Sequence, residues 1–95
     1  MRVRFFASLR TITGCSEAEV QYEETIGALA RSLCKLYGEN LRKKIFPAES
    51  SGGEDAFGPN IILLINGRHV SHLGGPSALL KPDDRVDFFP VLAGG

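Results

Sequence analysis

The stretch Ile61–Ile65 is the part of this sequence that most constrains the fold. All of its residues are apolar, most are β-branched, and the run is too short for a buried helix. Such a run is typical of a strand that is covered on both faces of its sheet. Asn66 and Gly67 follow directly, and this pair favours a type I′ turn, so residues 68–70 should return as a hairpin. The chain is therefore expected to fold around a β-sheet.

Alternating apolar and polar residues predict two further strands near the start of the chain. Residues 2–7 form the first, and residues 18–23 alternate as a second strand in a hairpin with it. Residues 9–14 between them are expected to form a turn or a short helical link. The residues of the first strand that should face the core are Val3, Phe5 and Ala7.

A helix is predicted from Thr25 to about Tyr37. Thr25 is a favourable N-cap, and Gly38 fits the position that follows the last turn. Leu41 and Ile45 are spaced to form one further turn. The apolar residues that recur at helical spacing on one stripe are Ile26, Leu29, Ala30, Leu33, Cys34 and Tyr37.

The last strand is predicted at residues 85–89, where apolar residues alternate with charged ones. Leu79 and Leu80 should pack just before it, and Pro90, which lacks a backbone donor, should end its hydrogen-bond ladder. The order is strand, strand, helix, strand, short strand, strand. This order predicts an α+β fold of the β-grasp (ubiquitin-like) type, a mixed sheet packed on one main helix, as a single domain over residues 1–95.

The composition excludes several classes of function. Lys and Arg number 11 and Asp and Glu also number 11, so there is no net charge and no basic field to attract nucleic acid. No apolar run is long enough to span a bilayer, and the first residues lack the apolar region of a signal peptide, so a cytoplasmic protein without membrane association is expected. Cys15, Cys34, His69 and His72 lack the spacing of a zinc site or a disulfide framework, so no metal is expected.

Two segments show no periodic pattern. Residues 47–59 are rich in serine, glycine and acidic residues and are expected to form a mobile loop, tolerated as an insertion. Residues 91–95 are expected to form a flexible arm that leaves the last strand and ends in Gly94 and Gly95. Fully extended, this arm would reach about 17 Å, at about 3.3–3.6 Å per residue. A tip without side chains suits a carboxylate that enters another protein's active site as its substrate.

Aromatic pairs and glycines are grouped in blocks toward both ends of the sequence. Near the start, Phe5-Phe6-Ala7 is followed by Leu9-Arg10 and then Gly14. Later come Asn66-Gly67, the run DDRVDFFP at residues 83–90, and Ala93-Gly94-Gly95. Together these blocks resemble the MoaD/ThiS-type sulfur carriers, most closely the small subunit of molybdopterin synthase. Two departures are the insertion at 47–59 and Val91-Leu92, where the family commonly has proline and then valine.

The resemblance implies a carrier that is no enzyme by itself and whose reacting group is the carboxylate of Gly95. An adenylyltransferase of the ubiquitin-activating type would use ATP to adenylate this carboxylate, while the carrier binds no cofactor. Sulfur from the persulfide of a donor protein would replace AMP and leave a thiocarboxylate. That sulfur would serve molybdopterin synthesis at the large subunit of molybdopterin synthase. Gly94 would let the arm pass through a narrow channel.

Strand parity predicts a docking face beside the arm. Residues that alternate with the core positions of the first and last strands point to the opposite side of the sheet. Two aromatic side chains fall there, and contiguous exposed apolar residues mark interfaces. The resemblance also places the docking face on this side. The residues predicted to bind partners are Phe6, His69, Phe89, Val91 and Leu92.

Other functions remain open from the sequence. A ubiquitin-like modifier joined through Gly95 to lysines of other proteins needs the same activated carboxylate. So does a sulfur carrier for thiamine or another thio-cofactor pathway. A β-grasp interaction module with an incidental arm would need neither Gly94 nor Gly95.

Overall fold

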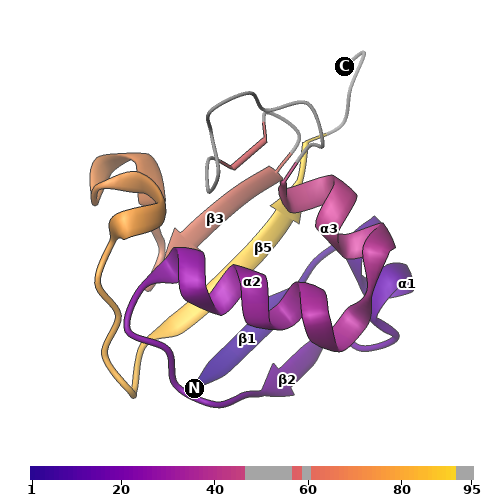
Figure 1. The fold of residues 1–95 in the computed structure, drawn as a ribbon, viewed down its shortest axis with the longest axis horizontal. Coiled ribbons are helices and arrows are strands. Elements are labelled where there is room, and N and C mark those ends of the chain that lie inside the picture. The colour runs from indigo at the N-terminus through magenta and orange to yellow at the C-terminus, as the bar shows by residue number, and fades with distance from the viewer. Residues whose placement is uncertain (47–56, 59–60, 92–95) are drawn as a thin grey trace.

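The computed structural model describes residues 1–46, 57–58 and 61–91. These residues contain a mixed five-stranded sheet with the strand order β2-β1-β5-β3-β4 (Figure 1). Strands β1 and β5 pair in parallel, and the other neighbouring strands are antiparallel. The strands are β1 (Arg2–Phe5), β2 (Glu17–Glu19), β3 (Ile61–Ile65), β4 (Arg68–His69) and β5 (Arg85–Pro90).

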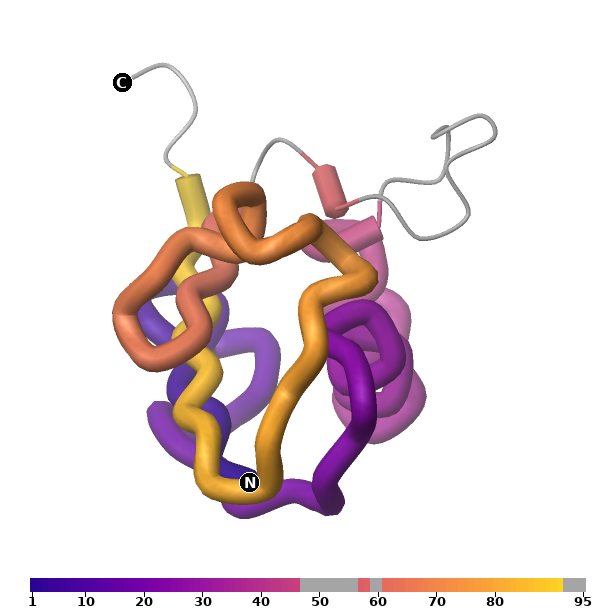
Figure 2. The backbone as a smooth tube through the Cα atoms, turned by 90° about the vertical axis from the view of Figure 1, so that its left-hand side faces the viewer, coloured from indigo at the N-terminus to yellow at the C-terminus, as the bar shows by residue number. Residues whose placement is uncertain are grey.

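One main helix crosses a face of this sheet, as the sequence predicts. The helices are α1 (Ser8–Thr13), α2 (Ile26–Tyr37) and α3 (Glu39–Ile45), with short 3₁₀ turns η1 (Val70–His72) and η2 (Gly75–Ser77). Figure 2 shows the strands on one side and α2 with α3 on the other. The α+β prediction is therefore confirmed.

The capping residues in the sequence predict both ends of α2 correctly. The Thr25 hydroxyl oxygen accepts a hydrogen bond from the backbone N–H of Ala28 at 3.1 Å, which satisfies one of the free donors of the first turn. Gly38 follows the last turn with φ +98°, a backbone angle that favours glycine. The chain then continues as α3, a full helix where the sequence predicts only one turn.

The core lies between the sheet and α2, and the pairing of β1 with β5 organises it. Val3 lies opposite Val86 and Phe5 opposite Phe88, so side chains from both ends of the chain meet on the same face. The Phe5 and Phe88 rings have centroids 5.6 Å apart. The largest fully buried side chains are Phe5, Phe88, Leu9, Ile26, Leu29, Leu33, Leu41, Ile45, Leu63, Val3 and Val86.

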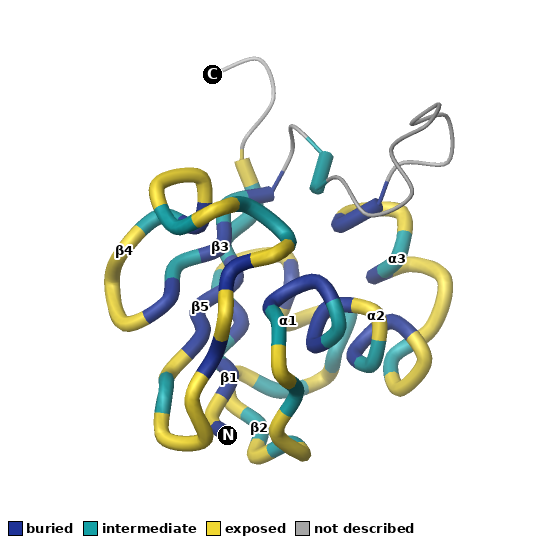
Figure 3. The backbone as a smooth tube through the Cα atoms, turned by 60° about the vertical axis from the view of Figure 1, so that its left-hand side comes forward, coloured by how far each residue is buried: buried dark blue, intermediate teal, exposed yellow. Residues whose placement is uncertain are grey.

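Strand β3 differs from the prediction. It pairs with β5 and, through the predicted hairpin, with β4. Asn66 and Gly67 both have positive φ, 51° and 85°, as a type I′ turn requires. However, Ile62 and Leu64 are only half-buried, whereas the alternate residues of β3 are buried (Figure 3). The expectation of cover on both faces is wrong, because an apolar run alone cannot distinguish a covered face from one that stays accessible.

Three smaller predictions are also wrong. Strand β2 ends at Glu19, and the residues after it approach the segment that precedes β5, where the Tyr22 hydroxyl donates to the Leu80 carbonyl at 2.9 Å. Ala7 is exposed, because the chain turns at this residue, with φ +54°, into α1. Leu79 is 73% exposed while Leu80 is buried, because an isolated bridge to Thr25 orients Leu79 outward.

Most of the predicted loop at residues 47–59 lies outside the described residues. Its Phe57 is half-buried, and its ring centroid is 5.6 Å from that of Phe46 at the end of α3. Among the residues that the structure describes, no helix is long and apolar enough to cross a membrane.

Gly27 yields a stability prediction. A Cβ at this buried position of α2 would lie 2.9 Å from the carbonyl oxygen of Pro76 in η2. Alanine usually stabilises a helix by about 0.5–1 kcal/mol relative to glycine. We nevertheless expect Gly27→Ala to lower the free energy of unfolding by about 1–3 kcal/mol, because the backbone of η2 must move away.

Urea unfolding measures this effect, and Ala28→Gly is the matched control in the same turn. The control should lose only about 0.5–1 kcal/mol through its backbone freedom. A Gly27→Ala variant more stable than the parent protein would contradict the packing of α2 against η2.

Candidate functional site

The face of the sheet opposite α2, here called the outer face, carries a stacked pair of aromatic side chains. The Phe6 and Phe89 rings lie 4.1 Å apart between centroids and are inclined by only 6°. Phe6 follows β1, and its backbone N–H donates to the Phe88 carbonyl at 3.1 Å, which extends the pairing with β5. Both rings are half-buried, whereas Phe5 and Phe88 are almost completely buried. The predicted parity is confirmed.

The apolar surface continues onto β3. Ile62 lies opposite Phe89 in the antiparallel register, and Leu64 is two residues further along the same face of β3. We call Phe6, Phe89, Ile62 and Leu64 the apolar patch. Sequence reasoning missed the two aliphatic residues because it assigned β3 to a fully covered position. The alternation of Ile62 and Leu64 with Ile61, Leu63 and Ile65 was the available signal.

His69 lies on the outer face at the far side of the patch. It pairs with Leu64 in the β3–β4 ladder, while Val70 after it is buried, as predicted. Its Nδ1 accepts a hydrogen bond from the backbone N–H of Ser71 at 3.1 Å and thereby caps η1. His69 therefore has a local structural role, and its part in partner binding stays a prediction.

A buried carboxylate borders the apolar patch. Asp87 of β5 is 3% exposed and accepts two hydrogen bonds from Arg4, from Nε at 2.9 Å and Nη2 at 3.0 Å. The Nε of Arg85 lies 3.6 Å from the second carboxylate oxygen. The hydrogen bonds to Asp87 raise the pKa of the Arg4 guanidinium further, although an arginine side chain is charged in any case.

The Arg4 guanidinium also lies 5.3 Å from the centroid of the Phe6 ring, within the range of a cation–π contact. It therefore joins the charged cluster to the apolar patch. The outer face consequently presents aromatic and aliphatic area next to an oriented, charged hydrogen-bonding group. Sequence reasoning missed Arg4 and Asp87, although both share the parity of Phe6 and Phe89.

The patch lies at the end of β5 from which the arm departs. Pro90 is the last residue of β5 and lies opposite Ile61, and Val91 after it is 39% exposed. The predicted site residues Leu92, Gly94 and Gly95 lie outside the described residues. The structure thus brings Phe6, Phe89 and the first residue of the arm to one end of the sheet.

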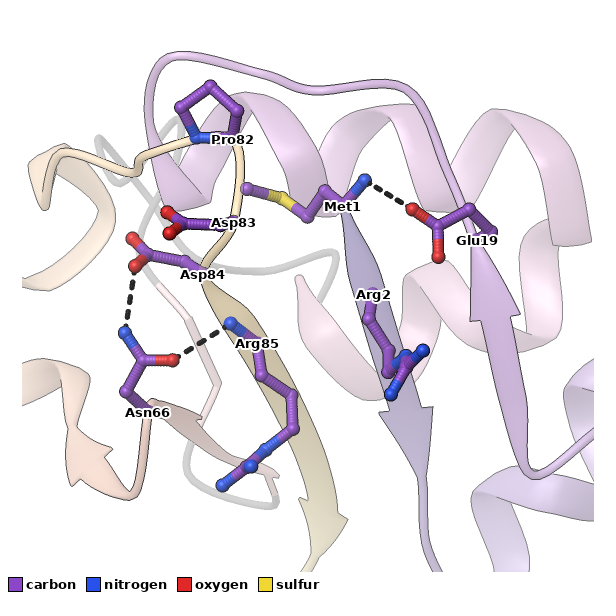
Figure 4. Close-up of a pocket in the computed structure, with 8 residues that line it drawn as sticks. All are labelled: Met1, Arg2, Glu19, Asn66, Pro82, Asp83, Asp84 and Arg85. Carbon is purple, nitrogen blue, oxygen red and sulfur yellow. Dashed lines mark hydrogen bonds and ion pairs between the residues drawn. The ribbon is translucent and has the colours of Figure 1, made fainter.

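The opposite end of the sheet holds a polar hollow of about 370 Å³. There Asn66 donates to the Asp84 carboxylate at 2.7 Å and accepts from the backbone N–H of Arg85 at 2.9 Å (Figure 4). These bonds tie the β3–β4 turn to the start of β5. The hollow is lined by Met1, Arg2, Glu19, Asn66, Pro82, Asp83, Asp84 and Arg85.

Both cysteines pack in or against the hydrophobic core. Cys34 is 8% exposed, and burial raises the pKa of its thiol, which opposes thiolate formation. The Cys15 sulfur lies 3.6 Å from the Tyr37 hydroxyl. Desolvation, helped by this contact, raises the pKa of Tyr37 to about 12. Across the described part of the chain, no group of three or more His, Cys, Asp or Glu side chains is arranged to hold a metal ion.

Comparison with known proteins identifies the family. The model of the ThiS family matches residues 3–95. Small archaeal modifier protein 3 of Haloferax volcanii is 33% identical over 97 residues, covering 100% of this chain and 98% of that protein.

Solved structures agree on the fold. The solution structure of small archaeal modifier protein 1 from Methanosarcina acetivorans has a TM-score of 0.82 at 28% identity, covering 99% of this chain and 94% of that one. A putative molybdopterin converting factor, subunit 1, from Pyrococcus furiosus has a TM-score of 0.68 at 23% identity, covering 96% and 95%. The latter likeness concerns the fold alone. The chain belongs to the ThiS family of ubiquitin-like β-grasp sulfur carriers and modifiers, small proteins that are not themselves enzymes.

Proposed function

We propose that this protein carries sulfur as a thiocarboxylate on Gly95. The observation that carries this proposal is the match to the ThiS family through residue 95, because it includes Gly94 and Gly95. The outer face supports it. An apolar patch beside the start of the arm gives a partner a surface to hold while the arm enters its active site.

Activation of Gly95 depends on a partner of the ubiquitin-activating adenylyltransferase type. A carboxylate oxygen of Gly95 attacks the α-phosphorus of ATP bound to that enzyme, and pyrophosphate leaves. The product is a mixed anhydride with AMP as a good leaving group. This chain supplies the nucleophile and the docking surface, and it binds no cofactor of its own.

Sulfur then replaces AMP. The terminal sulfur of a donor protein's persulfide attacks the carbonyl carbon of Gly95, and AMP leaves, which gives an acyl disulfide. A second thiol, of the donor protein or the adenylyltransferase, attacks the donor cysteine's sulfur in this disulfide. The sulfur–sulfur bond to the acyl group breaks, a disulfide forms between the two cysteines, and the thiocarboxylate is released on Gly95. No general acid or base of this chain takes part in these steps.

The apolar patch is the proposed docking site for these partners. Its stacked rings provide the rigid aromatic area that interface centres favour, and the Arg4–Asp87 pair provides an oriented polar border. His69 lies at the far edge of the patch, and Val91 follows β5 as the first residue of the arm. Leu92 is proposed to contact the same partners. A complementary partner surface is apolar at its centre and offers a hydrogen-bond acceptor to Arg4.

We propose molybdopterin synthesis as the pathway that receives the sulfur. The large subunit of molybdopterin synthase would bind a pyranopterin precursor and accept the sulfur from Gly95. The aromatic pairs Phe5-Phe6 and Phe88-Phe89 support this choice over the thiamine pathway, because they resemble the molybdopterin synthase small subunit.

Protein modification is the second candidate. It is favoured by the similarity to a relative named small archaeal modifier protein 3. Conjugation would join the activated carboxylate of Gly95 to a lysine amine by an amide bond. Conjugates that survive denaturant and thiol, and that contain Gly95 linked to lysine after proteolysis, would establish this function.

Removal of Gly95 tests the carrier proposal. Deletion moves the carboxylate back by about 3.5 Å, whereas reacting atoms must lie within roughly 3–3.5 Å of one another. Gly94→Val should fail as well, because a β-branched side chain obstructs a narrow channel and stiffens the backbone. We expect both variants to lose ATP–pyrophosphate exchange with the host's adenylyltransferase, with the stability of the fold unchanged.

The matched control for these changes is Leu79→Ala, at an exposed side chain outside the patch. It should support exchange at the parental rate. If the protein without Gly95 still supported exchange and gained sulfur, the carrier proposal would be wrong and the incidental-arm alternative would stand.

Aromatic substitutions test the docking site. Phe6→Ala and Phe89→Ala should weaken binding to the adenylyltransferase by about 2 kcal/mol or more, roughly a 30-fold rise in Kd. Phe5→Ala and Phe88→Ala should instead lower the free energy of unfolding by about 3–5 kcal/mol, because their rings fill the core. Urea unfolding and titration with the enzyme separate the two effects. Equal destabilisation by all four substitutions would rule out this assignment of the docking face.

A further inference from the structure

The β2 edge of the sheet presents backbone groups that point away from the other strands. The Val20 N–H donates to the Met1 carbonyl at 2.8 Å, and the Phe5 N–H donates to the Ser16 carbonyl at 2.9 Å. In an antiparallel pair this pattern directs every second residue of β2 toward β1. The backbone N–H and C=O groups of Glu17 and Glu19 therefore point away from β1, at the edge of the described sheet that β2 forms.

A groove of about 280 Å³ lies between α2 and the segment from Glu19, the last residue of β2, to Glu23. Its rim is polar, with Gln21, Glu23 and Ser32. Leu29 and Leu33 form its buried floor from α2, and Val20 contributes from the segment after β2. Leu36 borders the groove and is 64% exposed. A large apolar side chain therefore stays accessible to a partner beside the open edge. The groove can thus accept apolar side chains from a chain that lies along β2.

The segment that contains this edge is rich in acidic side chains. Residues 16–25 contain four glutamates and no lysine or arginine. Glu17 pairs with Arg2 at 3.0 Å and Glu19 with the Met1 amino group at 2.8 Å, but both carboxylates are exposed, at 49% and 73%. Exposed ion pairs contribute little free energy, so a competing cation can replace Arg2 beside Glu17. Met1 is buried and its amino group stays in place, but the exposed carboxylate of Glu19 leaves room for a second cation.

We propose that the β2 edge and its groove bind an extended segment of a partner protein in which basic and apolar residues alternate. Only a strand offers donors and acceptors at the spacing of Glu17 and Glu19, which are two residues apart. Its apolar side chains enter the groove beside Leu36, and its basic side chains lie beside the two glutamates on the outer face. A second copy of this chain is disfavoured, because pairing of two β2 edges would place glutamates opposite one another.

The groove is distinct from the apolar patch, because it faces α2 rather than the outer face. Glu17, however, lies opposite Arg4 on β1, so the basic side chains of the segment lie next to the charged border of the patch. The inference is independent of the chemistry of Gly95.

Amide hydrogen exchange measured by NMR on the full chain tests the proposal. The probe is a capped peptide of alternating lysine and valine, and the control peptide replaces lysine by glutamate. We expect the lysine peptide to slow exchange at the Glu17 and Glu19 amides by about tenfold or more. The glutamate peptide should leave both amides unchanged.

Matched variants locate the contact. Leu36→Glu should weaken peptide binding about tenfold or more, whereas Leu79→Glu, at another exposed leucine outside the groove, should not. Glu19→Pro removes one outward donor without removing a bond to β1 and should also weaken binding, beyond the effect of Glu19→Gln. Thermal unfolding confirms that each variant is folded.

Three results would overturn the proposal. They are an absence of binding up to about 1 mM peptide, protection of amides outside β2, and equal losses in Leu36→Glu and Leu79→Glu. Concentration-dependent protection without peptide, with dimers in sedimentation, would identify a second copy as the occupant and would also overturn it.

Discussion

The parallel pairing of β1 with β5 joins the two ends of the chain and orients the aromatic side chains on both faces of the sheet. Its register places Phe5 opposite Phe88 on the core face. The same register stacks Phe6 on Phe89 on the outer face. Because strand side chains alternate, a slip of β5 by one residue would turn Phe89 toward the core and expose Phe88, which breaks both pairs. One pairing therefore sets both the core and the candidate docking site.

The ion pair between Arg4 and Asp87 depends on the same register of β1 and β5. These residues are 83 positions apart and lie opposite one another only in this register. A buried carboxylate that lost its partner would remain desolvated at a cost of several kcal/mol. We infer that the pair disfavours slipped registers, and it also fixes Arg4 over Phe6. Stability of the sheet and orientation of the docking surface are thus coupled through one charged group.

The sequence was informative where a signal is local. The Thr25 cap, the Gly38 stop and the Asn66-Gly67 turn each depend on a few neighbouring residues, and the structure confirms all three. The alternation of side chains along a strand was enough to predict which phenylalanines face the core and which face outward. The errors depend on distant contacts: Leu79 points outward because of a bridge to Thr25, and β3 is covered on one face only. For the same reason the long-range pair of Arg4 and Asp87 was not predicted.

We propose that Gly95 of this ThiS-family protein carries sulfur. The most direct measurement is the mass of the C-terminal peptide of protein isolated from its native host under conditions that preserve acyl sulfur. We expect a fraction of the peptide in which one sulfur atom has replaced one oxygen atom at Gly95. Alkylation of that sulfur should increase the mass of this fraction further. A C-terminal peptide that is always the plain carboxylate, even in cells blocked in sulfur acceptance, would contradict the proposal.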